Sequence, residues 1–212
     1  METIIKNLEN VLAELKAKEA EQAVCAYGSE PVKDNRVALA TMAAGQRFKT
    51  SLGNFIVLGH DEMGTKVIQE AFYAEDKQFD SDSPDYTKSE LKEMFDTEIL
   101  EAYEKEFGAD NIVEHTVKLK SVDMQDFGSF DCKVRPITFD EARKYNELLV
   151  KEDLPDYYWT CTPWSTKERG WDYSVVVVSP RGSIDYWFFN GYYGVRPFCI
   201  LKSNIFVSKV EE

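Results

Sequence analysis

Metal binding and acid–base catalysis rely on histidines and carboxylates, and this chain offers few places where they gather. It has only two histidines, His60, which precedes Asp61 and Glu62, and His115. Their spacing matches no metal-ligand pattern, and residues 60–62 lie just before Gly64, as in a polar turn. The acidic stretch "DSDSPD" at 80–85 lacks the glycine and the closing glutamate of an EF-hand loop. We therefore expect no functional metal site.

Cysteine chemistry is the second candidate. Cys25, Cys132, Cys161 and Cys199 are far apart and form no C-x-x-C pair. Free thiols in a reducing compartment are the favoured interpretation, and a Cys161–Cys199 bridge is the alternative. A catalytic cysteine needs a nearby base, and the sequence points to none. Nucleotide-binding and hydrolase motifs are also missing, so we predict no catalytic residue and no cofactor.

The third candidate is a binding surface made of aromatic rings. Residues 179–197, "SPRGSIDYWFFNGYYGVRP", place aromatic side chains at 186–189, 192 and 193 between two turn-like tetrads. On a strand, Asp185, Trp187 and Phe189 would share one face. Tyr192 and Tyr193 stand beside Asn190 and Gly191, where we expect a turn and little burial. About half of these rings would enter the core, and the remainder would form an exposed patch of the kind that marks a contact site.

Composition limits the partners. The chain has 212 residues, 43% of them hydrophobic, which suits one folded domain with an appendage. A formal net charge of −13 repels phosphate, so we expect no nucleic-acid partner and no anionic membrane surface. Because no apolar run reaches about 18 residues and no secretory signal is recognisable, we expect no membrane insertion and a cytoplasmic site of synthesis.

The elements that would position the aromatic rings follow from local patterns. Residues 45–73 predict a three-stranded meander with turns at 52–54 and 62–64. A helix is expected after a Thr87/Glu90 capping box with a stop at Gly108, and a second after a Thr138/Glu141 box. Strands are expected near 112–123, 158–162, 173–179, 183–189 and 195–201. Without a repeated βαβ unit, this order predicts an α+β fold with a mostly antiparallel sheet and two helices.

The first residues form a separate prediction. Residues 1–26 read as an amphipathic, coiled-coil-like helix whose apolar seam is Ile4, Leu8, Val11 and Leu15. This helix either packs on its own domain or joins protomers into a homo-oligomer. Residues 27–44 read as a linker, and the domain proper is predicted over 45–212.

The segment from 157 onward carries two further motifs, Trp159-Thr160-Cys161-Thr162-Pro163-Trp164 and Gly194-Val195-Arg196-Pro197. With the strand pattern between them, they resemble the C-terminal half of the C-type-lectin-like fold. The similarity is to the branch of formylglycine-generating enzymes and diversity-generating-retroelement variable proteins, and in particular to an uncharacterised bacterial and phage family. It covers about residues 45–207 and leaves the N-terminal helix outside.

The resemblance implies a fold and a site. The corresponding segments of the retroelement variable proteins contact ligands, which implies a ligand-binding set of Trp164, Trp171, Tyr173, Asp185, Trp187, Phe189, Asn190, Tyr192 and Tyr193. The calcium loop of sugar-binding lectins and the active-site cysteine pair of formylglycine-generating enzymes have no counterpart here. Catalysis is therefore not transferred from the fold.

These observations lead to one expected function and two alternatives. We expect a non-enzymatic module of phage or prophage origin that binds an unknown protein or a cell-surface ligand and can be virion-associated. The first alternative is an enzyme of the formylglycine-generating type. The second is a structural virion component whose aromatic patch is a protein interface. Arg196 is expected to play a structural role, through a buried carboxylate or backbone carbonyls.

Overall fold

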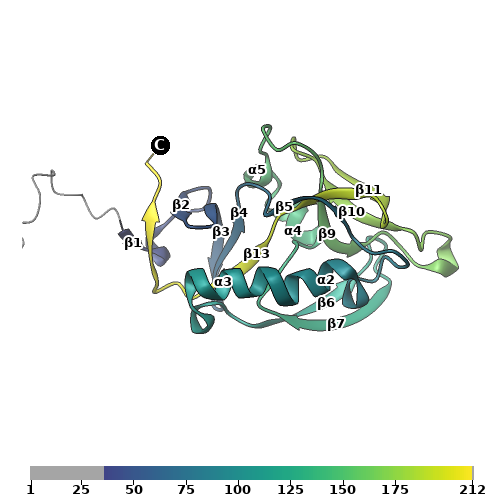
Figure 1. The fold of residues 1–212 in the computed structure, drawn as a ribbon, viewed down its shortest axis with the longest axis horizontal. Helices are drawn as coiled ribbons and strands as arrows, with labels where there is room; N and C mark the ends of the chain where they lie inside the picture. Colours follow the sequence, from purple (N-terminus) through teal and green to yellow (C-terminus); the bar gives the residue numbers. More distant parts are fainter. Residues whose placement is uncertain (1–35, 212) are drawn as a thin grey trace, which may run out of the picture. The chain divides into compact units, whose positions relative to one another are not determined.

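A computed structural model describes residues 36–211, and these form an α+β unit with mostly antiparallel sheets (Figure 1). The predicted α+β class is thereby confirmed. The larger sheet runs, in spatial order, β1 (Arg36–Ala38), β14 (Phe206–Lys209), β2 (Arg47–Thr50), β3 (Gly53–Asp61), β4 (Gly64–Gln69), β13 (Phe198–Leu201) and β8 (Val134–Arg135). The smaller sheet runs β11 (Ile184–Phe188), β10 (Ser174–Val178), β9 (Tyr158–Pro163), β12 (Tyr192–Val195) and β5 (Ala74–Gln78). A separate hairpin consists of β6 (His115–Lys120) and β7 (Asp126–Cys132).

The predicted meander is confirmed as β2, β3 and β4, which pair antiparallel in sequence order. Gly64 opens β4 with a φ of 147°. A Cβ atom at this position would lie 2.4 Å from the carbonyl oxygen of Leu201 on β13. Only glycine therefore lets β13 approach the turn at this distance.

Both predicted helices form, with one change in the capping. The first runs from α2 (Glu90–Met94) through a π-helical segment (Phe95–Ile99) into α3 (Leu100–Phe107), and it ends at Gly108 as predicted. Its cap is Ser89, whose hydroxyl accepts from the Lys92 N–H, so the predicted Thr87/Glu90 box is wrong. Thr87 instead donates its own N–H to Asp85, which caps a preceding 3-10 turn.

The second helical segment comprises α4 (Phe139–Lys144) and α5 (Asn146–Leu149). The predicted capping box is present at its start. The Thr138 hydroxyl accepts from the Glu141 N–H, and the Glu141 carboxylate accepts from the Thr138 N–H at 2.8 Å. This reciprocal pair satisfies two donors that a helix start otherwise leaves unpaired.

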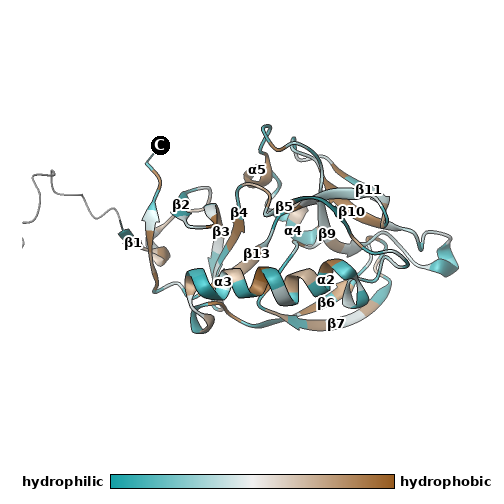
Figure 2. Cartoon of the chain, viewed as in Figure 1, coloured by the Kyte–Doolittle hydropathy of each residue, from teal (hydrophilic) through white to brown (hydrophobic). Residues whose placement is uncertain are grey.

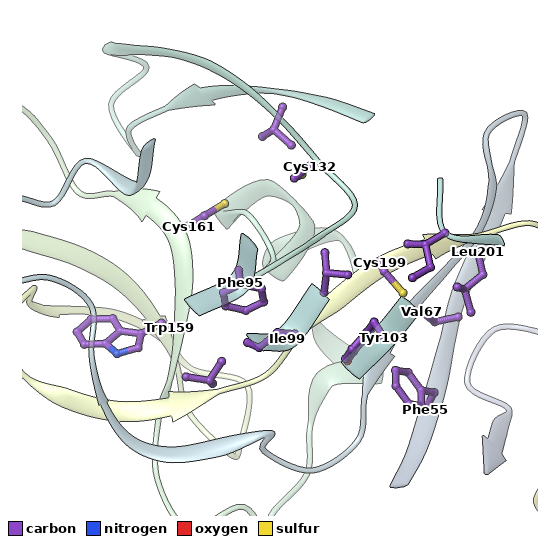
Figure 3. Close-up of a cluster of buried hydrophobic side chains, with 14 of the residues drawn as sticks. Phe55, Val67, Phe95, Ile99, Tyr103, Cys132, Trp159, Cys161, Cys199 and Leu201 are labelled. Atoms are coloured by element: carbon purple, nitrogen blue, oxygen red, sulfur yellow. The ribbon is translucent and has the colours of Figure 1, made fainter. Parts of the chain in front are cut away.

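The central strands of the larger sheet, β3, β4 and β13, are buried on both faces. Along β3, Phe55 and Val57 enter one hydrophobic cluster, and the alternating Ile56 and Leu58 enter another. The first cluster lies against the α2–α3 run, where Ile99 and Tyr103 face Phe55, Val67 and Cys199 (Figure 3). The second cluster includes Ala142 and Leu149 from α4 and α5. Figure 2 shows hydrophobic residues on β4 and β10.

The boundary at Gly45 is a correction. Residues 36–44 were predicted to be part of a linker, but β1 pairs with β14, and Leu39 and Met42 are buried in the main cluster. Short-range patterns missed this because the strand is only three residues long and its partner lies at the far end of the chain. The predicted helix over 1–26 and residues 27–35 of the predicted linker lie outside the described residues.

The predicted single strand over 195–201 is also corrected. β12 ends at Val195 in the smaller sheet, and β13 begins at Phe198 in the larger one. Between them, Pro197 has no N–H to donate to a ladder, and the fully buried Arg196 turns inward. Its guanidinium donates to the carbonyl oxygens of Gln69 at the end of β4 and Leu149 at the end of α5, both at 2.8 Å, which matches the expected backbone role.

Candidate functional site

The aromatic segment forms the rim of the smaller sheet. β11 is an edge strand that pairs only with β10 within the described chain, and it lies along the outer side of β10 in Figure 1. By contrast, β10 is flanked by β9 and β11, and Val175–Val178 are completely buried, as predicted from their β-branched run. A rigid apolar strand therefore supports an outer strand whose side chains remain accessible.

On one side of β11, rings from two segments form a continuous row. Trp164 lies against Tyr186 with ring centroids 4.4 Å apart, and Trp171 meets the same tyrosine at 5.3 Å with the planes at 85°. Trp171 also contacts Tyr173 at 5.7 Å, and Tyr173 contacts Phe188 at 5.3 Å. The loop at 164–173 and β11 thus form one surface. Some of its residues belong to the ligand-binding set that was predicted from the sequence.

A second group of rings connects this edge to the core. Trp187 lies 6.1 Å from Tyr193, and Tyr193 meets the edge of the buried Trp159 at 4.9 Å. Tyr192 and Tyr193 were predicted to lie in a turn, but they belong to β12 and pair with Gln78 and Lys77 of β5. Tyr192 points outward and Tyr193 is half-buried, so the two neighbouring tyrosines have different surroundings.

Four rings of the smaller sheet and its adjoining loop are strongly accessible: Tyr173 at 37%, Trp187 at 42%, Phe188 at 55% and Tyr192 at 59% of their maximal exposure. We call Trp164, Trp171, Tyr173, Tyr186, Trp187 and Phe188 the β11 aromatic surface, whereas Tyr192 lies on β12, beyond β10 and β9. Large rings exposed together are unusual in a soluble protein and cost free energy unless something covers them.

The remaining predicted site residues differ in their positions. Asp185 and Asn190 are exposed. Phe189 is half-buried and packs against the main cluster, and its carbonyl oxygen accepts from the N–H groups of Phe79 and Asp80. Phe189 therefore anchors the end of β11 to the domain, whereas Asp185 is free to meet a partner.

Tyr186 and Phe188 belong to the surface but were absent from the sequence-based set. Alternation suggested that one face of this strand enters the core. Because β11 is an edge strand with a neighbour on one side only, both Trp187 on one face and Phe188 on the other remain exposed. The sequence did contain a sign of this. The segment "IDYWFF" lacks the alternation of apolar and polar residues that is usual for a strand with one buried face.

Two hollows adjoin this surface, and Trp171 lines both. One, of about 410 Å³, is lined mainly by aromatic residues of β11 and the 171–173 loop. The other, of about 490 Å³, contains Asp123, which accepts from Ser121 and Ser165 and pairs with Arg169 at 3.3 Å. These hydrogen bonds and the nearby guanidinium lower the pKa of Asp123, so this carboxylate does not serve as a proton donor near neutral pH.

The histidines occupy structural positions. The ring nitrogens of His60 lie 2.8 Å from the Thr65 hydroxyl and 2.7 Å from the Met42 carbonyl oxygen. His115 Nε2 lies 3.2 Å from Arg135 Nε, an arrangement in which the neutral imidazole accepts. Burial and the charge of Arg135 lower the pKa of His115 and keep it neutral. Within residues 36–211, no group of three or more potential metal ligands is present.

The structure also brings together a cysteine and a histidine that the sequence did not pair. Cys132 Sγ lies 3.7 Å from His115 Nε2. Burial raises the pKa of Cys132 to about 11 and that of Cys161 to about 12, so neither is a reactive thiolate at neutral pH. Cys161 and Cys199 are free and buried, so the alternative of a bridge between them is not realised.

Comparisons with protein-family profiles, with curated proteins and with solved structures find no match for this chain. Among the helices of residues 36–211, none combines the length and the apolar character needed to cross a bilayer.

Proposed function

We propose that this protein is a non-enzymatic ligand-binding module, of phage or prophage origin, that presents the β11 aromatic surface to a protein or cell-surface ligand. The observation that carries the proposal is the contrast between two neighbouring strands. β10 is completely buried, and β11 beside it exposes Trp187 and Phe188 on opposite faces. Tryptophan and tyrosine supply large contact area at low cost in conformational entropy, which suits recognition.

A C-type-lectin-like fold is part of the proposal. It is supported by the arrangement of the two motifs that suggested it, because β9 carries the first motif and β12 leads into the second. Gly194 of β12 forms a parallel bridge to Tyr158 of β9. A Cβ atom on Gly194 would lie 2.2 Å from the Phe72 ring, so any other residue here would force that ring to move.

The enzymatic alternative is disfavoured by the surroundings of the thiols. A formylglycine-type reaction needs accessible cysteines, whereas the three cysteines within residues 36–211, Cys132, Cys161 and Cys199, are buried and their pKa values are raised by burial. The alternative of a structural virion component uses the same surface as a protein interface. It differs from the first proposal in requiring a permanent partner.

Arrays of glycans and of displayed peptides test the proposal. A genuine ligand should lose about 1 kcal/mol or more of binding free energy when Trp187 or Phe188 is changed to alanine. Phe206→Ala is the matched control, because Phe206 is strongly exposed but lies on β14 in the other sheet. Ligands that bind the Trp187→Ala, Phe188→Ala and wild-type proteins equally would contradict the proposal.

A further inference from the structure

The hollow at the β11 edge has a chemically selective lining. It is lined by the rings of Trp171, Tyr173, Tyr186, Trp187 and Phe188, and the charged residue of its lining is Asp185. No lysine, arginine or histidine lines it. Its volume, about 410 Å³, lies in the range of small-molecule sites.

The ring geometry favours a cation over a flat apolar group. The planes of Trp171 and Tyr186 stand at 85°, and Tyr173 is tilted by 37° from Trp171 and by 44° from Phe188. A parallel pair of rings would form a slot for another ring. Rings in edge-to-face or tilted contact do not form such a slot. Their faces carry the negative part of the ring quadrupole, which attracts a cation, as in aromatic cages for ammonium ions.

Asp185 supplies the charge that such a ligand needs. Asp185 lines the hollow from the strand face that it shares with Trp187, and one of its carboxylate oxygens accepts from the Tyr186 N–H at 2.8 Å. The other oxygen has no hydrogen-bond or ion-pair partner among the described residues. The nearest basic residue in the adjoining hollow, Arg169, is already paired with Asp123 at 3.3 Å. The net charge of −13 adds a long-range attraction for cations.

We infer that the hollow at the β11 edge binds an organic ammonium group, with the rings enclosing its methyl groups and Asp185 balancing its charge. This inference rests on the proposed function, because it names the ligand class of the same surface. The ammonium group is either a free quaternary ammonium compound or a methylated lysine side chain, and the chemistry of recognition is shared.

Saturation-transfer NMR on the full chain provides the test, with choline and its neutral isostere 3,3-dimethylbutanol as probes. Both carry three methyl groups of the same shape, so only the charge differs. Choline should bind at least about tenfold more tightly than the isostere. N-acetyl-trimethyl-lysine amide forms the third arm, and tighter binding of this compound than of choline assigns the group to a lysine side chain.

Single-residue variants separate the contribution of the Asp185 charge from that of the rings. Asp185→Asn keeps the oxygen that accepts from Tyr186 and removes the charge, so the affinity for choline should fall about threefold while the affinity for the isostere is unaffected. Phe188→Leu should lower the affinity for choline. Tyr192→Leu changes a residue outside the hollow and should not.

Equal affinity for choline and the isostere would overturn the ammonium inference but leave an apolar binding surface. Absence of binding by all three probes would overturn the inference, and the array experiment would then decide the proposed function independently.

Discussion

At the scale of single residues, burial separates the rings that hold the fold together from those available to a ligand. Trp159 is completely buried, and its indole N–H donates to the Lys77 carbonyl oxygen at 2.7 Å. Trp159→Ala should lower the free energy of unfolding by about 3–5 kcal/mol. Tyr192→Ala should change it by about 0.5 kcal/mol or less, because Tyr192 is exposed.

Tyr193 lies between these extremes, whereas the sequence grouped it with Tyr192. Tyr193→Ala should cost about 1–2 kcal/mol, because the edge contact with Trp159 is lost. Urea unfolding of the three variants measures the order of their losses in free energy of unfolding. If Tyr192→Ala costs as much as Trp159→Ala, the exposed rings serve packing, and the proposed display is wrong.

A second residue-scale prediction concerns the ion pair of Arg135 with Glu141. Burial alone would raise the pKa of Glu141, but the charge of Arg135 and its bidentate hydrogen bonds lower it from 4.5 to about 2. The folded state therefore prefers the carboxylate. This contribution, on the order of 3 kcal/mol, is present above about pH 4.5 and is lost as the pH falls towards 2.

The pH dependence of urea unfolding measures this loss. The Arg135→Met/Glu141→Leu double variant removes both charges, so no unpaired charge remains buried. Its free energy of unfolding should fall less steeply between pH 4.5 and pH 2 than that of the wild type. Parallel curves for the two proteins would show that Glu141 does not carry this acid sensitivity.

At the scale of elements, the hydrogen-bond pattern of β11 defines which of its backbone groups are accessible. The Phe189 N–H donates to Tyr173 at 3.0 Å, and the Ser179 N–H donates to Ser183 at 2.8 Å. Because hydrogen-bonded pairs alternate along an antiparallel ladder, the N–H groups of Asp185 and Trp187 point towards β10. Those of Ile184 and Phe188 point outwards.

Hydrogen exchange followed by NMR should reproduce this alternation. The Asp185 and Trp187 amides, together with the amides of β10, should exchange slowly, and the Ile184 and Phe188 amides should exchange fast. The Tyr186 N–H is a useful internal control, because it points outwards but donates to Asp185. Equal protection along the whole strand would mean that another element covers the β11 edge.

At the scale of the whole molecule, the fold closes by pairing its two ends. β1 pairs with β14, and Leu39 and Met42 contribute to the main cluster. Removing residues 1–34 should therefore preserve cooperative thermal unfolding, whereas removing residues 1–44 should destabilise the domain strongly, because two buried apolar residues and a strand are lost. Calorimetry compares the truncations, and equal melting temperatures would restore the predicted boundary at Gly45.

The same shorter truncation tests assembly. If the Ile4, Leu8, Val11 and Leu15 seam joins protomers, removal of residues 1–34 should lower the molar mass in light scattering to that of a monomer. A Leu8→Asp/Leu15→Asp variant of the full chain is the matched control and should dissociate in the same way. An unchanged mass in both proteins would reject an oligomer built by this helix.

Local sequence determined the parts of this protein that depend on neighbouring residues. The turn at Gly64, the Thr138/Glu141 capping box, the stop at Gly108 and the buried run at 175–178 were predictable, because each depends on residues a few positions apart. Tertiary structure alone decided the β1–β14 pairing, the division of 195–201 between two sheets and the ion pair of Arg135 with Glu141. It also decided which rings are exposed, because a ring's burial depends on whether its strand lies at the centre or the edge of a sheet, and that position is set by contacts between residues far apart in the chain.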